Sequence, residues 1–260
     1  MDLQFNTKLF DNYNSTSQKI RVATEDWVNQ SIYCPNCGNV NITEQPNNRP
    51  VSDFVCADCK EEYELKSKKD ALGLKIVDGA YDTMIGRLQS ANNPNFFFLN
   101  YDTHTYSVKN FLVIPKHFFT PSIVEKRKPL SPTARRAGWV GCNILLHNIP
   151  NSGKIHYVQN GHVVPKKEVV SNWTSTLFLR KIQDIPSKGW LLDVMKCIER
   201  IKKTDFTLDE VYEFEKELKL LHPNNNHIKD KIRQQLQLLR DIEYLDFTKR
   251  GSYSLTRKDY

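Results

Sequence analysis

The chain of 260 residues carries 37 Lys and Arg against 30 Asp and Glu, which gives a formal net charge of +7. This length suffices for one large or two modest domains with a core that needs no disulfide bonds, and the positive excess favours a polyanionic partner. The first ten residues lack the apolar stretch of a signal peptide, and no apolar run has the length of a membrane span. We therefore expect a cytoplasmic protein that has no membrane partner.

The first part of the chain alternates between helical and strand patterns. Apolar side chains recur at helical spacing in some segments and alternate with polar ones in others. The predicted elements are helices over residues 17–28 and 78–90 and strands over 51–55, 63–67, 95–101 and 110–114. The order helix, strand, strand, helix, strand, strand indicates a mixed α/β domain.

The segment from about residue 115 to 172 is rich in proline and less regular. It has seven Lys or Arg against one acidic residue between positions 116 and 154. We expect a short helix to begin at Ser131, and a strand over 155–159 that turns back at Asn160-Gly161. The basic excess makes this segment a candidate for contact with a polyanion.

The composition changes near residue 183, where we place the boundary between a first domain, 1–182, and a second domain, 183–260. Three helices are expected in the second domain, over 190–201, from Thr207 and from about 226 to 243. Thr207 with Glu210 has the pattern of a capping box. Two short strands with a basic turn between them follow, over 244–248 and 252–256. Three helices and a hairpin indicate an α+β winged-helix domain, which is a DNA-binding fold.

Four cysteines form two CxxC pairs, Cys34 with Cys37 and Cys56 with Cys59. The eighteen residues between the pairs are a spacing typical of a tetrahedral zinc site with four thiolate ligands. Incidental cysteines and redox pairs are the alternatives. Because four thiolates fill the coordination sphere, we expect a structural rather than a catalytic Zn²⁺.

Asp53, Glu64 and Lys66 are interleaved with these cysteines. Alternate residues of a strand share a face, so Glu64 and Lys66 project together, and a neighbouring strand would bring Asp53 to them. Two carboxylates can hold Mg²⁺, and an ammonium beside them can orient the attacking water for phosphodiester hydrolysis. A Glu-x-Lys pair alone is more often an exposed ion pair. The combination with Asp53 and with the predicted order of elements favours a catalytic site.

Two segments have the chemistry of DNA contacts. The third helix and the hairpin turn of the second domain concentrate amide and basic side chains, although a solvated helix face has the same composition. In the first domain, two arginines lie near a tryptophan, and all three could contact DNA. A tryptophan buried in the core, with the arginines on the surface, explains the pattern equally well. The candidates are Asn225, Asn226, His227, Lys229, Arg233, Gln234, Lys249 and Arg250 in the second domain, and Arg135, Arg136 and Trp139 in the first.

Four stretches of the sequence resemble the DpnI family of methyl-directed restriction endonucleases. They are residues 48–69, 93–99, 128–139 and 225–236, and the similarity extends over essentially the whole chain. The resemblance implies a PD-(D/E)XK nuclease domain, which is a restriction-endonuclease-like α/β fold with a mixed sheet and here a four-cysteine zinc knuckle. A C-terminal winged helix follows it.

The resemblance also implies a function and the roles of site residues. In the family both domains bind DNA, and the substrate is double-stranded GATC whose adenines carry N6-methyl groups. By position, Asp53 and Glu64 correspond to the Mg²⁺ ligands, Lys66 to the catalytic lysine and the four cysteines to the zinc ligands. Ser52 stands where the superfamily name has proline. The family further implies a monomer.

Methyl dependence predicts an apolar pocket, because an N6-methyl group replaces one N–H by an apolar group. Trp139 and the third helix of the second domain are candidates for that pocket. Two other functions stay open: a zinc-ribbon and winged-helix regulator that binds DNA without cutting it, and a nuclease that ignores methylation. Mg²⁺-dependent scission separates the regulator from the enzymes, and matched methylated and unmethylated DNA separates the two enzymes.

Overall fold

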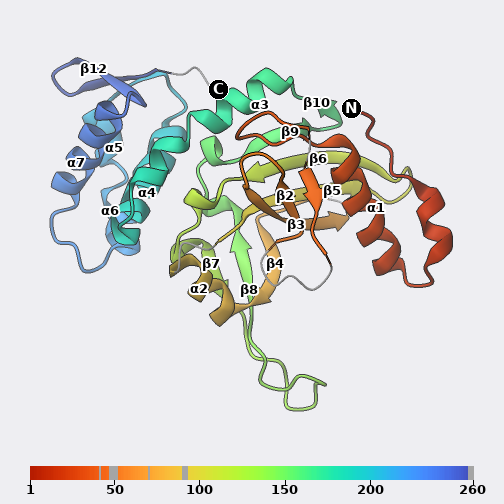
Figure 1. The fold of residues 1–260 in the computed structure, drawn as a ribbon. Coiled ribbons are helices and arrows are strands. Elements are labelled where there is room, and N and C mark those ends of the chain that lie inside the picture. The colour runs from red at the N-terminus through yellow and green to blue at the C-terminus, as the bar shows by residue number, and fades with distance from the viewer. Residues whose placement is uncertain (41, 47–51, 70, 90–92, 257–260) are drawn as a thin grey trace. The chain divides into compact units, whose positions relative to one another are not determined.

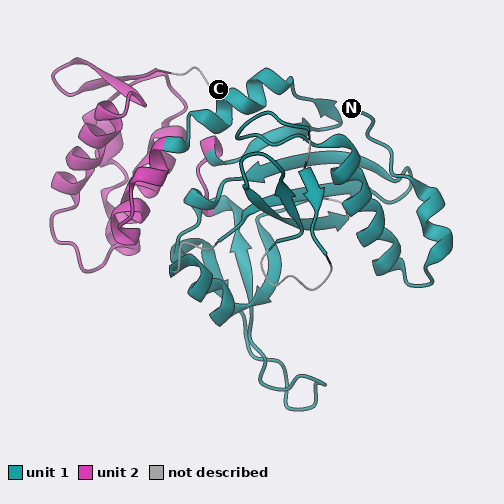
Figure 2. Ribbon diagram, viewed as in Figure 1, with its two compact units in different colours: residues 1–147, 153–177 teal, residues 148–152, 178–260 magenta. Residues whose placement is uncertain are grey.

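The computed structural model describes residues 1–40, 42–46, 52–69, 71–89 and 93–256. The chain divides into two compact units (Figure 2). The first comprises Met1–His147 and Gly153–Leu177, and the second comprises Asn148–Ser152 and Phe178–Tyr260. Within the described residues, no helix is both long enough and apolar enough to cross a membrane.

A 7-stranded sheet forms the centre of the first unit, in the order β1-β2-β3-β5-β6-β9-β10 (Figure 1). Strands β3 and β5 are parallel and every other neighbouring pair is antiparallel, so the sheet is mixed as predicted. Its strands are β1 Ile42–Glu44, β2 Phe54–Cys56, β3 Glu62–Lys69, β5 Asn95–Asp102, β6 Ser107–Ile114, β9 Ile155–Gln159 and β10 His162–Val163.

A second sheet of three strands has the order β4-β8-β7. Its strands are β4 Lys75–Ala80, β7 Val124–Lys126 and β8 Gly141–Leu145. The helices of the first unit are α1 Thr16–Ser31, α2 Tyr81–Gln89 and α3 Lys166–Thr174. Short 3-10 turns lie at Thr7–Asn12, Lys116–Phe118, Pro121–Ile123, Leu146–Asn148, Asn151–Gly153 and Leu177–Lys181.

The alternation of side chains along β3 decides which of them enter the core. Tyr63 is fully buried, and its ring stacks on that of Phe97 at a centroid distance of 4.5 Å. Trp27 from α1 and Trp173 from α3 belong to the same apolar cluster. Each such large side chain contributes about 1.5–3 kcal/mol by leaving water. Glu64 and the other residues of the opposite alternation therefore stay outside this cluster.

Three expectations for the first unit differ from the structure. The helix expected from Asp78 begins only at Tyr81, because residues 78–80 end strand β4. The helix expected from Ser131 is wrong; residues 132–138 form successive turns, in which Pro132 supplies no backbone donor. Conversely, residues 166–174 form helix α3 in a segment expected to be irregular. The strand expected over 51–55 lies partly outside the described residues, and β2 begins at Phe54.

The second unit is the predicted winged helix. It contains the helices α4 Ile185–Ile201, α5 Leu208–Tyr212, α6 Glu215–Leu221 and α7 Ile228–Asp241 and the strands β11 Asp205–Thr207, β12 Leu245–Lys249 and β13 Ser252–Leu255. The three strands pair in the order β11-β13-β12. Both halves of the capping box between Thr207 and Glu210 are present.

The helix expected from Thr207 is in fact two helices, α5 and α6, separated at Glu213 and Phe214. Glu213 keeps helical backbone angles, and Phe214, with φ −84° and ψ 4°, departs from them only slightly. Such a small departure leaves the apolar spacing intact, so periodicity does not reveal it. The break sets the Phe214 ring 4.8 Å from the guanidinium of Arg200.

Candidate active site and zinc centre

Strands β2 and β3 form an antiparallel hairpin that carries all three predicted catalytic residues. Phe54 pairs with Tyr63, and the N–H of Asp53 donates to the carbonyl of Tyr63 at 2.9 Å. The Asp53 carboxylate then reaches along the hairpin and accepts the N–H of Leu65 through Oδ2 at 2.6 Å. The backbone therefore fixes Asp53 beside Glu64, as a hairpin return predicts.

Glu64 and Lys66 project together from β3. Their Oε1 and Nζ atoms lie 2.5 Å apart. The same ammonium lies 2.5 Å from Oδ1 of Asp78, whose side chain is only 7% exposed. Arg87 of α2 approaches the other oxygen of Glu64, Oε2, at 3.5 Å. Lys66 is therefore held between two carboxylates, one from each sheet of the unit.

Burial and neighbouring charges perturb both members of this pair. Burial raises the pKa of Glu64 above its ordinary value, and the negative charges of Asp78 and Asp53 raise it further against the opposing effect of Lys66. Burial lowers the pKa of Lys66, but the charges of Glu64 and Asp78 outweigh it and the pKa is raised. The lysine is therefore an ammonium, able to donate hydrogen bonds and to offset negative charge.

The donor set at Asp53 and Glu64 fits a magnesium ion. Mg²⁺ prefers carboxylate oxygens and is commonly held by one or two of them. The Asp53 carboxylate is hydrogen-bonded to the N–H of Leu65, the residue that follows Glu64, so the two carboxylates belong to one end of the same hairpin. Because Asp53 accepts the Leu65 N–H through Oδ2, its Oδ1 is left for a metal.

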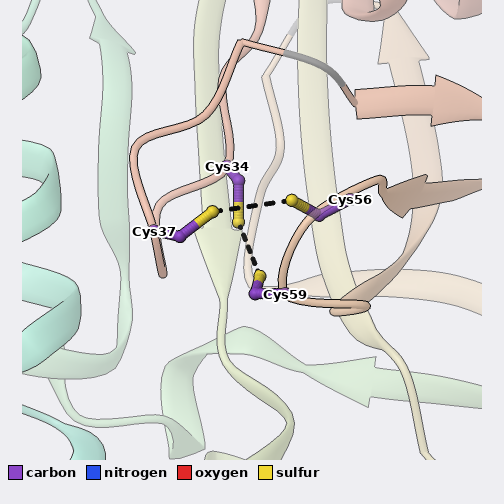
Figure 3. A group of neighbouring side chains, drawn as sticks. All are labelled: Cys34, Cys37, Cys56 and Cys59. Carbon is purple, nitrogen blue, oxygen red and sulfur yellow. Dashed lines mark hydrogen bonds between the residues drawn. The ribbon is translucent and has the colours of Figure 1, made fainter.

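The four cysteines converge on one point, as Figure 3 shows. All four sulfur atoms lie within 4.8 Å of one another. The Cys34 and Cys59 sulfurs are 3.4 Å apart, and those of Cys37 and Cys56 are 3.6 Å apart. A tetrahedral zinc ion with bonds of about 2.3 Å needs sulfurs about 3.8 Å apart. The cluster therefore fits a structural Zn²⁺.

Each CxxC pair is a tight turn of the same design. The N–H of Gly38 donates to the carbonyl of Cys34 at 2.8 Å, and the N–H of Lys60 donates to that of Cys56 at 3.1 Å. Both donors have a left-handed backbone, with φ of 77° for Gly38 and 61° for Lys60. The second turn is also the connection between β2 and β3. The zinc site thus closes the hairpin that carries Asp53 and Glu64.

The basic candidates of the first unit lie on an arm between β7 and β8. Figure 1 shows this arm as a long connection that extends away from the sheets of the unit. Arg135 and Arg136 are exposed on it, and Arg136 lies 4.8 Å from the ring of Trp139. Trp139 is half-buried, and a Cβ on Gly141 would lie 2.8 Å from its ring. The tryptophan belongs to the base of the arm rather than to the core.

The candidates of the second unit lie on α7, the loop before it and the β12–β13 turn. Asn225 is half-buried, and its side chain accepts the N–H of His227 at 2.7 Å, which orders the loop. Lys229 lies 5.1 Å from the ring of Tyr212, and Arg233 donates to the hydroxyl of Tyr212 at 3.1 Å. The exposed candidates are Asn226, His227, Lys229, Arg233, Gln234, Lys249 and Arg250.

Two residues of the first site are absent from the sequence prediction. Asp78 and Arg87 reach Glu64 and Lys66 from β4 and α2. Strand β4 pairs with β8, more than sixty residues further along the chain. Its sequence from Lys75 to Ala80 has two adjacent apolar residues, Ile76 and Val77, and lacks the polar and apolar alternation that predicts a strand. The apolar spacing instead places Asp78 in the following helix.

Two family models together match most of the chain. The DpnI model, described as the Dam-replacing family, matches residues 1–182. The model of its C-terminal part, described as the Dam-replacing HTH domain, matches residues 186–255. A helix-turn-helix domain indicates DNA binding. The chain therefore belongs to the DpnI, or Dam-replacing, family, and this membership supports a methylation-dependent restriction nuclease with a DNA-binding domain.

Proposed function

We propose that the chain is a Type II restriction endonuclease that cleaves double-stranded DNA at GATC sites carrying N6-methyladenine. The proposed reaction is Mg²⁺-dependent hydrolysis of a phosphodiester. The observation that carries this proposal is the hairpin that sets Asp53, Glu64 and Lys66 beside one another in a member of this family. The two family matches also support a catalytic domain over 1–182 and a DNA-binding domain over 183–260.

In the proposed mechanism, Asp53 and Glu64 hold Mg²⁺ through their carboxylates. A bound Mg²⁺ supplies charge to the phosphoryl oxygens and lowers the pKa of water. Lys66 donates hydrogen bonds to the attacking water or to the phosphate and offsets the developing negative charge. The hydrogen bond from Leu65 fixes Asp53, which keeps the carboxylate in place while the substrate reacts.

We propose that both units contact DNA. Arg135 and Arg136 on the arm have the charge and exposure to bind phosphates, and α7 presents Arg233 and Gln234 with the chemistry to read base edges. Exposed Lys249 and Arg250 on the β12–β13 turn suit a contact with the phosphate backbone. For the methyl group, the half-buried ring of Trp139 and apolar side chains near α7 are the candidate contacts. The family resemblance supports a monomer that acts in the cytoplasm.

Asp53→Asn tests the proposed site. We expect the purified protein to cleave methylated plasmid with Mg²⁺ and to leave it intact when Mg²⁺ is omitted. The variant should lose cleavage by at least about 100-fold while it still binds a methylated duplex, since the amide keeps the shape but not the charge. Asp11→Asn, on an exposed turn, is the matched control and should cleave normally. Cleavage by Asp53→Asn at the normal rate would reject the site.

A DNA-binding regulator is the second candidate function. It predicts specific binding to DNA without strand scission at any Mg²⁺ concentration. The intact set of Asp53, Glu64 and Lys66 argues against it, because a protein that only binds DNA gains nothing from half-buried carboxylates around an ammonium. Binding without scission by the unmodified protein would favour this second candidate.

A further inference from the structure

Asp78 contacts the candidate catalytic lysine from a different sheet. It lies on β4, and its Oδ1 atom is 2.5 Å from Nζ of Lys66. The pairing of β4 with β8 is interrupted between Asp78 and Ala80, where Gly79 is the extra residue. Before that interruption the strand alternates regularly: Ile76 is buried and Val77 is exposed, so the side chain of Asp78 points to the same side as Ile76. Here the side chain turned inwards is a carboxylate with 7% exposure.

The contact between Asp78 and Lys66 restricts a flexible side chain. A lysine ammonium sits on four flexible carbons, and the rotamer freedom of that side chain opposes its confinement. Glu64 alone cannot keep Lys66 in place during the reaction, because the proposed mechanism also requires Glu64 to bind Mg²⁺. Asp78 gives Lys66 a second carboxylate, which does not depend on Glu64.

Asp78 does not join the other two carboxylates in a preformed metal site. We consider groups of three or more His, Cys, Asp or Glu side chains whose ligand atoms all lie within 4.8 Å of one another. Among the described residues, the four cysteines are the one such group. The oxygen of Asp78 that faces the site is instead in contact with an ammonium. The geometry therefore favours a lysine anchor over a third metal ligand.

We propose that Asp78 is a positioning residue that holds the Lys66 ammonium at the scissile phosphate when Glu64 engages Mg²⁺. This inference rests on the proposed nuclease function and adds to it a residue from the second sheet. The groups that surround Lys66 are Glu64 on β3, Asp78 on β4 and, across Glu64, Arg87 on α2. Asp78 is the one of these that contacts Lys66 and has no assigned part in binding the metal.

The test is Asp78→Asn in single-turnover cleavage of methylated DNA across a Mg²⁺ titration. We expect the rate at saturating Mg²⁺ to fall about 10- to 100-fold, as when a hydrogen bond between charged groups is removed. The Mg²⁺ concentration at half-maximal rate and the affinity for DNA should stay unchanged. Asp82→Asn, exposed in the first turn of α2, is the matched control and should cleave normally.

Two results would overturn the proposal. One is an unchanged cleavage rate in Asp78→Asn. The other is a rate that excess Mg²⁺ restores, because that would make Asp78 a metal ligand. A merely structural role would lower the melting temperature and DNA affinity together with the rate. Should Asp78→Asn be too unstable to assay, Asp78→Glu, which keeps the charge, must retain more activity than Asp78→Ala.

A second measurement does not depend on cleavage at all. In protein labelled with ¹⁵N-lysine, the Lys66 ammonium should exchange its protons with water slowly enough to be observed, and Asp78→Asn should remove that protection. Lys66→Arg identifies the signal. Equal protection in both proteins would reject the proposal. Protection that depends on Asp78 in a protein that cuts no DNA would reject the nuclease function and leave the lysine anchor in place.

Discussion

The phenol oxygen of Tyr63 lies 3.1 Å from the sulfur of Cys34, and Tyr63 directly precedes Glu64 in strand β3. Tyr63 is fully buried, so one residue contacts a candidate zinc ligand through its side chain and adjoins the candidate magnesium ligand Glu64 through its backbone. A hydroxyl that donates to a metal-bound thiolate orients that ligand. The zinc centre and the catalytic strand are thus parts of one packed unit.

Tyr63→Phe should weaken zinc binding by about tenfold, because it removes the hydrogen bond and leaves the ring in the core. Competition with a chromogenic chelator measures the affinity. Tyr33→Phe is the matched control, since the Tyr33 hydroxyl is buried and has no hydrogen-bond partner among the described residues. The same zinc affinity in the two variants would show that the Tyr63 hydroxyl has no influence on the metal.

Cys56→Ser should impair folding and cleavage together. Cys56 ends β2 and begins the turn that leads into β3, so removal of the metal releases the hairpin that carries Asp53 and Glu64. Zinc content, thermal melting and cleavage should fall in parallel. Cys197 is a buried cysteine of α4 outside the cluster, and the Cys197→Ser protein should keep its zinc content. A fully active, zinc-free Cys56→Ser protein would show that the two sites are only neighbours.

Glu64→Gln should stabilise the metal-free protein at neutral pH. Burial raises the pKa of Glu64, so the folded state holds this proton more tightly than the unfolded chain does. The associated stability is complete at low pH and is lost as pH rises through the folded pKa. Ionised Glu64 therefore costs stability at pH 7, and the glutamine avoids that cost. Melting from pH 4 to 8 in buffer without added Mg²⁺ measures it.

The difference in melting temperature between Glu64→Gln and the unmodified protein should grow with pH. Glu62→Gln, on the same strand, is the control, and its melting should follow that of the unmodified protein. A lower stability of Glu64→Gln at neutral pH would mean that the ion pairs with Lys66 and Arg87 outweigh the burial of the carboxylate.

The double variant Arg135→Ala, Arg136→Ala should weaken DNA binding without changing sequence preference. Both side chains are exposed on the arm, where they can neutralise phosphates. For each phosphate that is no longer neutralised, the slope of log affinity against log salt should become shallower by about 0.9. Titrations at several salt concentrations with methylated and unmethylated duplexes give both the slope and the preference. An unchanged slope would remove the arm from the DNA interface.

The sequence predicts the fold class correctly because the elements that define it are strongly patterned. The apolar strand at Asn95–Asp102 and the capping box at Thr207 both carry local signals. Strand β4 carries no such signal, because its sequence from Lys75 to Ala80 has two adjacent apolar residues and no alternation of polar and apolar ones. The turns after Ser131 resemble the start of a helix in sequence, since proline is compatible with the first turn of a helix.

In the candidate site, the residues of one hairpin could be predicted from the sequence, whereas the residues that reach it from other elements could not. Glu64 and Lys66 share a face because they are two residues apart in one strand, and Asp53 returns through a short hairpin. These relationships follow from strand geometry. The contacts from Asp78 and Arg87 depend on the packing of β4 and α2 against the central sheet, which no spacing in the sequence encodes.

Digestion of two preparations of one plasmid tests the central claim most directly. One preparation comes from a host that methylates the adenine of GATC and the other from a host that does not. With Mg²⁺ present, we predict that the protein cuts the methylated plasmid into fragments that end at GATC sites and leaves the other intact. Equal cutting of both would contradict methyl dependence, and cutting of neither would contradict the nuclease function itself.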